Sequence, residues 1–179
     1  VQGSLIDSYR NWNFWRFDLK FTLEESERSI LYELQLESIN EESWSFYVPG
    51  ATQVWRMAAY SCSGFSHGVK QEDWMVEGDH PMVYHLLQKH QRKPLHVCFG
   101  GGDQLYNDDV FECPHMHDWL NIQDRHKRLT CAFSDALKQE AEDYYFTHYC
   151  QHFQTKSLRD MCAKIPNVML WDDHDIFDG

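Results

Sequence analysis

The chain has 179 residues, of which 42% are hydrophobic, 15% aromatic and 25% charged, values typical of one globular domain of ordinary size or of two small ones. Its 28 acidic and 16 basic side chains give a formal net charge of −12, which argues against a protein that binds nucleic acid through a basic patch. The aromatic content excludes a disordered or fibrous chain, and no apolar run reaches the roughly 20 residues that a membrane-spanning helix needs.

The first part of the chain is expected to form a small antiparallel β unit. Apolar and polar residues alternate over residues 14–23 and again over 30–36, which is typical of strands with one buried face. Two further strands are expected at residues 44–48 and 54–60, on either side of the turn at Pro49-Gly50. The predicted core of this unit contains three tryptophans: Trp12, Trp15 and Trp44.

In the rest of the chain, strands are expected to alternate with helices, as in α/β proteins. The pattern predicts helices over residues 81–90, 129–153 and 157–164. It predicts apolar strands over residues 95–99 and 167–171. Five histidines on or beside the helices are expected to be surface or interface residues: His80, His85, His90, His148 and His152.

Two of the predicted strands run into acidic segments. The strand at 95–99 leads through three glycines into residues 103–109, and the strand at 167–171 leads into residues 172–175. In open α/β sheets, functional groups collect beyond the carboxyl ends of the strands. Carboxylates that lie within a few ångströms repel one another, and a metal cation relieves that repulsion. Turns and helix caps also use Asp and Asn, but two clusters in matching positions favour a metal site.

Three motifs in these positions resemble those of a known family. The segment Gly102-Asp103-Gln104-Leu105-Tyr106 is similar to the Gly-Asp-x-x-Tyr motif shared by purple acid phosphatases and PhoD-like alkaline phosphatases, both of the calcineurin-like metallophosphoesterase group. Ser61-Cys62 resembles the strand end at which PhoD-like enzymes use a cysteine as a metal ligand. Trp171-Asp172-Asp173-His174-Asp175 resembles their Trp-Asp-Asp-His-Asp/Glu motif. Each motif is short, but the ordered set is specific.

The resemblance implies the N-terminal portion of a PhoD-like enzyme. The implied fold is α/β, the first half of a four-layer α/β/β/α sandwich, preceded by a small antiparallel β-sandwich-like unit. Residues 1–53 would form the β-rich N-terminal domain and residues 54–179 the N-terminal half of the metallophosphatase domain. The histidines that the superfamily supplies from later strands have no counterpart in this sequence. The chain is therefore expected to be a truncated fragment that is inactive alone.

The resemblance also implies a set of metal ligands. Cys62, Asp103 and Tyr106 would bind a ferric ion, which stabilises the deprotonated forms of a thiol, a carboxyl and a phenol. Asp103 would bridge to a second metal site, which calcium occupies in PhoD-like enzymes. Asp173 would supply an oxygen ligand to that second site.

The implied activity is metal-dependent hydrolysis of phosphomonoesters or phosphodiesters. His174 would lie beside the scissile phosphate, where it would stabilise developing charge or protonate the leaving oxygen. Asp175 would orient that imidazole. Asp108 and Asp172 are weaker candidates, since they are near enough to touch a metal ion but are not part of the motif.

Other interpretations of the same residues stay open from the sequence. Cys62 could be a packed free thiol, Tyr106 a core aromatic residue, and His174 a cap on the carboxylate cluster. The rival function is a noncatalytic acidic module, which would bind calcium structurally and a partner through the β unit.

The remaining cysteines favour a structural interpretation. The six cysteines have wide, irregular spacing, and most of them are interpreted as free thiols in packed positions: Cys62, Cys98, Cys113, Cys131, Cys150 and Cys162. Within that set, Cys113 lies near His115 and His117 and could begin a zinc site. A fourth ligand would have to be His126 or Cys131, and nothing in the spacing selects either, so we favour the interpretation without a metal.

Overall fold

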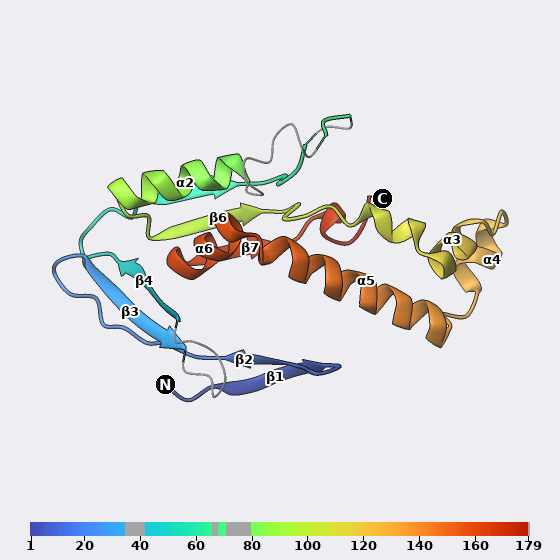
Figure 1. Cartoon of the computed structure of the whole chain (residues 1–179), viewed down its shortest axis with the longest axis horizontal. Coiled ribbons are helices and arrows are strands. Elements are labelled where there is room, and N and C mark those ends of the chain that lie inside the picture. The colour runs from blue at the N-terminus through green and yellow to red at the C-terminus, as the bar shows by residue number, and fades with distance from the viewer. Residues whose placement is uncertain (35–41, 66–67, 71–79, 179) are drawn as a thin grey trace.

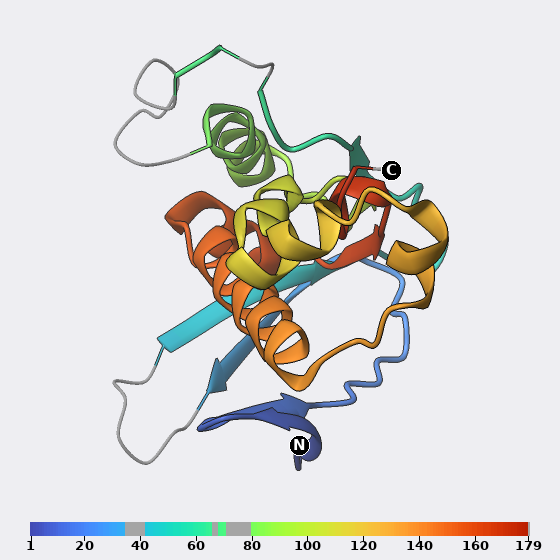
Figure 2. The same ribbon diagram turned by 90° about the vertical axis from the view of Figure 1, so that its right-hand side faces the viewer.

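The computed structural model describes residues 1–34, 42–65, 68–70 and 80–178. It has two antiparallel hairpins and one three-stranded parallel sheet, together with helices (Figures 1 and 2). The hairpins are β1 (Ser4–Tyr9) with β2 (Trp12–Arg16), and β3 (Arg28–Leu34) with β4 (Glu42–Val48). The parallel sheet has the order β5 (Met57–Tyr60), β6 (Val97–Gly101) and β7 (Asn167–Leu170). The α/β class is confirmed, and the four-layer sandwich stays a prediction.

Helices connect and cover these strands. They are α2 (Pro81–Arg92), α3 (Pro114–Leu120), α4 (Arg125–Thr130), α5 (Asp135–Phe153) and α6 (Lys156–Lys164), with 3-10 helices at Asp108–Glu112 and Asp173–Asp175. Within the described ranges, no helix has both the length and the apolar character needed to cross a bilayer.

The single helix predicted over residues 129–153 is wrong, because two helices, α4 and α5, occupy that region. The Ser134 hydroxyl accepts a hydrogen bond from the Leu137 N–H at 3.2 Å. A serine whose side chain satisfies an otherwise unpaired N–H marks a helix start, so α5 begins after Ser134. Phe133, which the helical pattern included, lies outside both helices and is 64% exposed.

The strand predicted over residues 14–23 is correct only at its start. β2 ends at Arg16, which pairs with Ser4 of β1, and residues 17–24 form no strand. Alternation predicts which side chains would share the buried face of a strand, but a strand also needs a neighbouring strand to form hydrogen bonds along its length. β1, which the pattern did not predict, supplies that partner only as far as Arg16.

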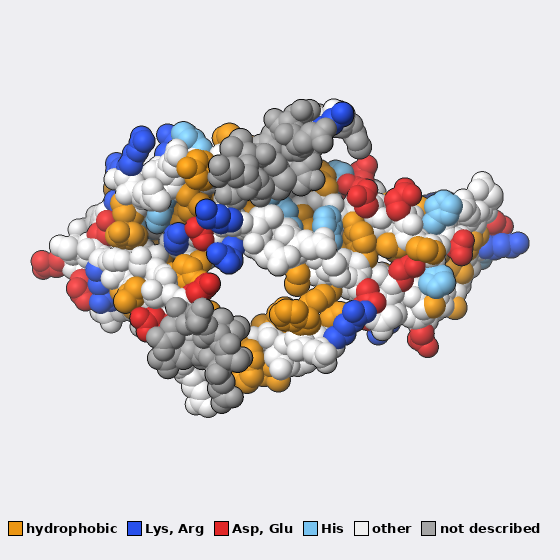
Figure 3. Space-filling model, in the orientation of Figure 1, with side chains coloured by type: hydrophobic (Ala, Val, Ile, Leu, Met, Phe, Trp, Pro, Cys, Tyr) orange, Lys and Arg blue, Asp and Glu red, His pale blue; other side chains and the backbone are white. Residues whose placement is uncertain are grey.

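The prediction that Trp12 and Trp15 lie in a core is also wrong. Their side chains are 63% and 55% exposed, and Figure 3 shows hydrophobic side chains at the surface over hairpin β1–β2. An isolated two-stranded hairpin forms a single layer, so it buries side chains only where another element covers it. Trp44 is half-buried on the second hairpin, where its ring lies 5.6 Å from that of Tyr32.

One face of the parallel sheet packs against α2 and α6. The core of this packing comprises Leu87 from α2, Cys98 from β6, Leu158 and Met161 from α6, and Ile165 just after it. On the other face of the sheet, Phe99, Val168 and Leu170 are 42%, 52% and 69% exposed. The helices therefore anchor the site-bearing strands from one side.

Met161→Ala should lower the free energy of unfolding by about 2–5 kcal/mol, the usual cost of truncating a buried methionine. Met161 is 1% exposed, and the truncation would leave a cavity between α6 and β6. Denaturant unfolding measures the effect. Met82→Ala on α2 is the matched control, because that side chain is 75% exposed and should change stability little. Equal losses in both variants would contradict this packing.

Of the two positions predicted for His90, surface or interface, the structure shows the second, because its ring centroid lies 5.8 Å from that of Tyr47 on β4. Its side chain is 6% exposed, and its Nδ1 accepts a hydrogen bond from the Leu95 N–H at 3.0 Å. This contact holds the turn between α2 and β6. Burial lowers the pKa of His90 below its ordinary value, so the neutral imidazole serves as the acceptor.

Candidate metal centre

Three loops meet at the carboxyl edge of the parallel sheet. Because the strands are parallel, β5, β6 and β7 end at the same edge, and the chain passes directly into Cys62, Asp103 and Asp173. The first two loops are joined by hydrogen bonds from the Cys62 N–H to the Gly102 oxygen at 3.2 Å and from the Ser63 N–H to the Asp103 oxygen at 2.8 Å. The sheet thus brings together residues from three motifs that lie far apart in sequence.

The backbone of these loops is unusual at the proposed ligands. Cys62 and Asp103 have φ values of 55° and 52°, in the left-handed region that non-glycine residues rarely adopt. Gly102, at φ 107°, makes the close approach of the third loop possible, because a Cβ there would lie 2.5 Å from the Cβ of Asp172. A Cβ on Gly64 would similarly lie 2.4 Å from the ring of Tyr106. Both glycines let loops pack where a larger residue would separate them.

Asp103 lies at the centre of the site and is 8% exposed. Its Oδ2 is 3.4 Å from the Cys62 sulfur, and its Oδ1 is buried without a hydrogen-bond partner. Ligand atoms of Asp103, Asp173 and His174 all lie within 4.8 Å of one another. A buried carboxylate oxygen without a donor is costly, and a second carboxylate nearby adds repulsion. A bound cation would pair with the buried oxygen and offset the repulsion between the carboxylates, so the donor set fits a metal ion.

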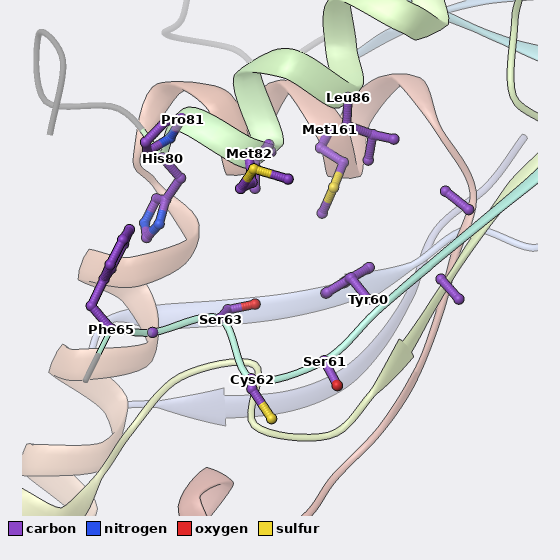
Figure 4. Close-up of a pocket in the computed structure, with 14 residues that line it drawn as sticks. Tyr60, Ser61, Cys62, Ser63, Phe65, His80, Pro81, Met82, Leu86 and Met161 are labelled. Atoms are coloured by element: carbon purple, nitrogen blue, oxygen red, sulfur yellow. The ribbon is translucent and has the colours of Figure 1, made fainter. Parts of the chain in front are cut away.

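Cys62 lies between this cluster and a neighbouring apolar pocket, and its sulfur contacts Asp103 of the cluster. A cavity of about 370 Å³ lies beside β5, with Met82 and Met161 among its lining residues. Figure 4 shows the sulfur pointing away from those two side chains. All six cysteines are free thiols, but the prediction that most are packed is wrong, because Cys62, Cys131, Cys150 and Cys162 are exposed.

Tyr106 lies beside the cluster with its ring centroid 4.6 Å from that of His174. Burial, together with the negative charges of Cys62 and Asp103, raises the pKa of Tyr106 to about 12. The phenol is therefore protonated at neutral pH in this environment, and a cation bound close by would be needed to stabilise the phenolate.

The imidazole of His174 is held by Asp108 and not by Asp175. Its Nδ1 lies 2.8 Å from Asp108 Oδ2 and 3.0 Å from Oδ1. Burial lowers the pKa of His174, but the hydrogen bond and charge of Asp108, with Asp103 and Asp173, raise it above the ordinary value overall. Asp108 is thus the residue that favours the charged imidazole.

Asp175 instead holds the loops after β6 and β7 together. Its buried carboxylate accepts hydrogen bonds from the N–H groups of Asp103 and Gln104, each at 2.8 Å, and of Asp172 at 2.9 Å. The backbone on either side of the cluster is thereby tied to one side chain. Its role in orienting His174, as the resemblance implies, would act through the loop and not through the imidazole nitrogen.

Asn107 is a site residue that the sequence analysis missed. It is fully buried, its N–H donates to the His174 oxygen at 3.0 Å, and its Nδ2 donates to the Asp175 oxygen at 2.8 Å. A short polar side chain in an Asp- and Asn-rich loop looks like an ordinary turn residue. Only the structure distinguishes Asn107 from a turn residue, because its hydrogen bonds join its own loop to the loop of His174 and Asp175.

The structure brings together no zinc ligands around Cys113. In the part of the chain that the structure describes, the only group of three or more His, Cys, Asp or Glu side chains with converging ligand atoms is the one at Asp103.

His152, on the helix behind the site, is expected to make folding sensitive to acid. Burial, with the neighbouring His80 and His148, lowers the pKa of His152 from 6.5 to about 4. Between these two values the unfolded chain binds a proton that the folded protein does not. Stability therefore falls as pH drops through this window, by up to about 1.4 kcal/mol per pH unit, and is unaffected by this group above it.

Urea unfolding at about pH 7.5 and about pH 5 measures this prediction. His152→Gln should reduce the loss of stability between the two conditions. The control is His85→Gln on the exposed side of α2. An unchanged loss in His152→Gln would contradict the prediction.

The fold and the cluster together define an α/β protein with a candidate metal centre at the carboxyl edge of a parallel sheet. Residues 35–179 match the family model described as PhoD related phosphatase, and the chain belongs to this family. The resemblance inferred from the three motifs is thus confirmed.

The chain is also similar to an uncharacterized protein of Saccharomyces cerevisiae, with 29% identity over 181 residues. That alignment covers 93% of this chain and 25% of the yeast protein, so the chain spans about a quarter of the length of this relative. No solved structure matches the chain.

Proposed function

We propose that this chain contributes part of the metal centre of a phosphatase that hydrolyses phosphomonoesters or phosphodiesters. Residues 1–53 would form its β-rich N-terminal domain, and residues 54–179 would belong to the metallophosphatase domain. The observation that carries the proposal is the position of Asp103: its Oδ1 is buried without a partner, and its Oδ2 is 3.4 Å from the Cys62 sulfur. Membership of the PhoD-related family supports a phosphate ester as the substrate.

Two metal ions would be held by the described donors. Cys62, Asp103 and Tyr106 would hold Fe³⁺, because three anionic donors are stabilised best by a highly charged ion. Asp103 and Asp173, as oxygen donors, would hold Ca²⁺.

When bound, the metal ions would supply Lewis acidity for the phosphoryl oxygens and would lower the pKa of a water molecule. His174 would then act on the leaving oxygen. Its Nδ1 is engaged by Asp108, so Nε2 is the nitrogen that would donate a proton. Asp108 keeps the imidazole oriented and favours its protonated form, and Asp175 holds the backbone of the loop in place.

Metal analysis combined with a hydrolysis assay on the full-length protein tests the proposal. We expect bound iron and calcium, a visible absorption band from thiolate or phenolate on ferric iron, and hydrolysis of p-nitrophenyl phosphate or its bis ester that a chelator abolishes. A colourless protein that binds calcium without iron and hydrolyses neither ester would overturn the proposal. That result would favour the noncatalytic calcium-binding module.

A further inference from the structure

One face of α5 faces the loop that carries Asp173 and His174. Tyr145, His148 and Tyr149 have the spacing i, i+3, i+4, which places their side chains on the same side of a helix. The Tyr145 hydroxyl donates to the Ile176 oxygen at 2.9 Å, and the Tyr149 hydroxyl donates to the Asp175 oxygen at 2.8 Å. Two side chains of α5 thus bind the loop directly.

His148 reaches the same loop through Asn107. The Asn107 amide Nδ2 donates to the Asp175 oxygen, so its Oδ1 is the acceptor for the His148 Nδ1, 2.9 Å away. The Asn107 backbone N–H donates to the His174 oxygen at 3.0 Å. The carbonyl oxygens of three consecutive residues, 174 to 176, are therefore all held by α5 or by Asn107.

These contacts satisfy groups that the local structure leaves unpaired. The 3-10 helix Asp173–Asp175 is a single turn, and the last carbonyl groups of any helix lack partners within it. Without donors from α5 these carbonyl groups would need solvent, and the loop would keep only its other ties to the segment after β6, such as the Asp175 carboxylate. The donors come from a helix that also packs through Phe146 on the first hairpin, with ring centroids 4.9 Å from Tyr9 and 6.2 Å from Trp12.

We propose that Tyr145, His148 and Tyr149 are positioning residues that set the place of Asp173 and His174 relative to Asp103. The proposal rests on the function proposed above for the same loop. Small displacements of reacting groups are costly, because a misplacement of about 1 Å can lower a rate by about a hundredfold. The three residues would act through the backbone of the loop and touch neither metal nor substrate.

Hydrogen exchange on the metal-free full-length protein tests the positioning independently of catalysis. In the double variant Tyr145→Phe/Tyr149→Phe, amides of residues 172–178 should exchange faster by about two- to tenfold for each hydrogen bond lost. Tyr32→Phe is the matched control, because the Tyr32 hydroxyl also donates to a backbone carbonyl, that of Ala163 at 2.7 Å, but on α6. Unchanged exchange at 172–178 in the double variant would overturn the proposal.

Kinetics of the metal-loaded protein supply the second test. The double variant should show kcat lowered by about 10- to 100-fold with KM unchanged, whereas Tyr32→Phe should keep both. His148→Gln, which can still donate to Asn107, should recover activity relative to His148→Leu. Loss of activity with slow, wild-type exchange at 172–178 would refute a positioning role. If the wild-type protein is inactive with every metal, the proposed phosphatase function fails, while the exchange experiment still decides whether α5 holds the loop.

Discussion

Asp103→Asn is expected to lower kcat/KM of the full-length protein by more than about a hundredfold and to reduce its metal content in parallel. Loss of residues that only support a metal ligand typically costs about 10- to 100-fold, so loss of a ligand shared by two ions should cost more. Asp103 is the buried carboxylate on which the rest of the site converges, and the substitution keeps its shape while removing its charge. Metal analysis and the hydrolysis assay on the same sample measure both effects.

Two comparisons make this prediction specific. Asp118→Asn removes an exposed carboxylate on α3 and should leave metal content and activity unchanged. Cys62→Ala should remove iron and its visible absorption band, because the thiol is one of the three donors assigned to that ion. Full activity and metal content in Asp103→Asn would refute the assignment of the site.

His174→Ala should lower kcat by about 10²–10⁴-fold, the range typical of a lost general acid, while metal content is retained. Asp108→Asn should act through the same imidazole and cost about 10- to 100-fold. The structural reason is the pair of contacts at 2.8 and 3.0 Å between His174 Nδ1 and the Asp108 carboxylate. Asp108→Asn should also move the alkaline limb of the activity profile to lower pH, because a general acid must be protonated and the substitution removes the partner that raises the pKa of His174.

The metal content of His174→Ala separates two roles for this residue. Its imidazole lies within the group of converging ligand atoms, so it could also bind metal directly. Loss of metal in His174→Ala would therefore assign it as a ligand and contradict the role of general acid. His115→Ala, at an exposed position on α3, is the control and should be neutral in both measurements.

Much of the candidate site could be predicted without the structure, because short-range patterns carried the necessary information. The apolar segments around residues 97 and 168 predict strands, and parallel strands end at a common edge. Residues that directly follow those strands must then lie close together. The acidic segments 103–109 and 172–175 were predicted on that basis, whereas the ligands Cys62, Asp103 and Asp173 were implied by the family resemblance; the sheet brings all three to one edge.

The partners of those residues could not be predicted in the same way. Asp108 contacts His174 across 66 positions in sequence, and Asp175 binds the amides of residues more than 70 positions away. Nothing in the motif shows which of several nearby aspartates contacts the imidazole of His174 and which binds the backbone amides. The choice depends on how the loops pack, and Gly102 makes that packing possible by leaving room for Asp172.

The sequence by itself determined the α/β class, the order of the three motifs and the family to which the chain belongs. These properties follow from local patterns, because apolar periodicity and residue spacing act within a single element. Only the tertiary structure decided that Trp12 is exposed, that His90 is buried and that α5 reaches the loop through Tyr145 and Tyr149. Those outcomes depend on which elements cover one another, and that is a property of the packed chain and not of any one segment.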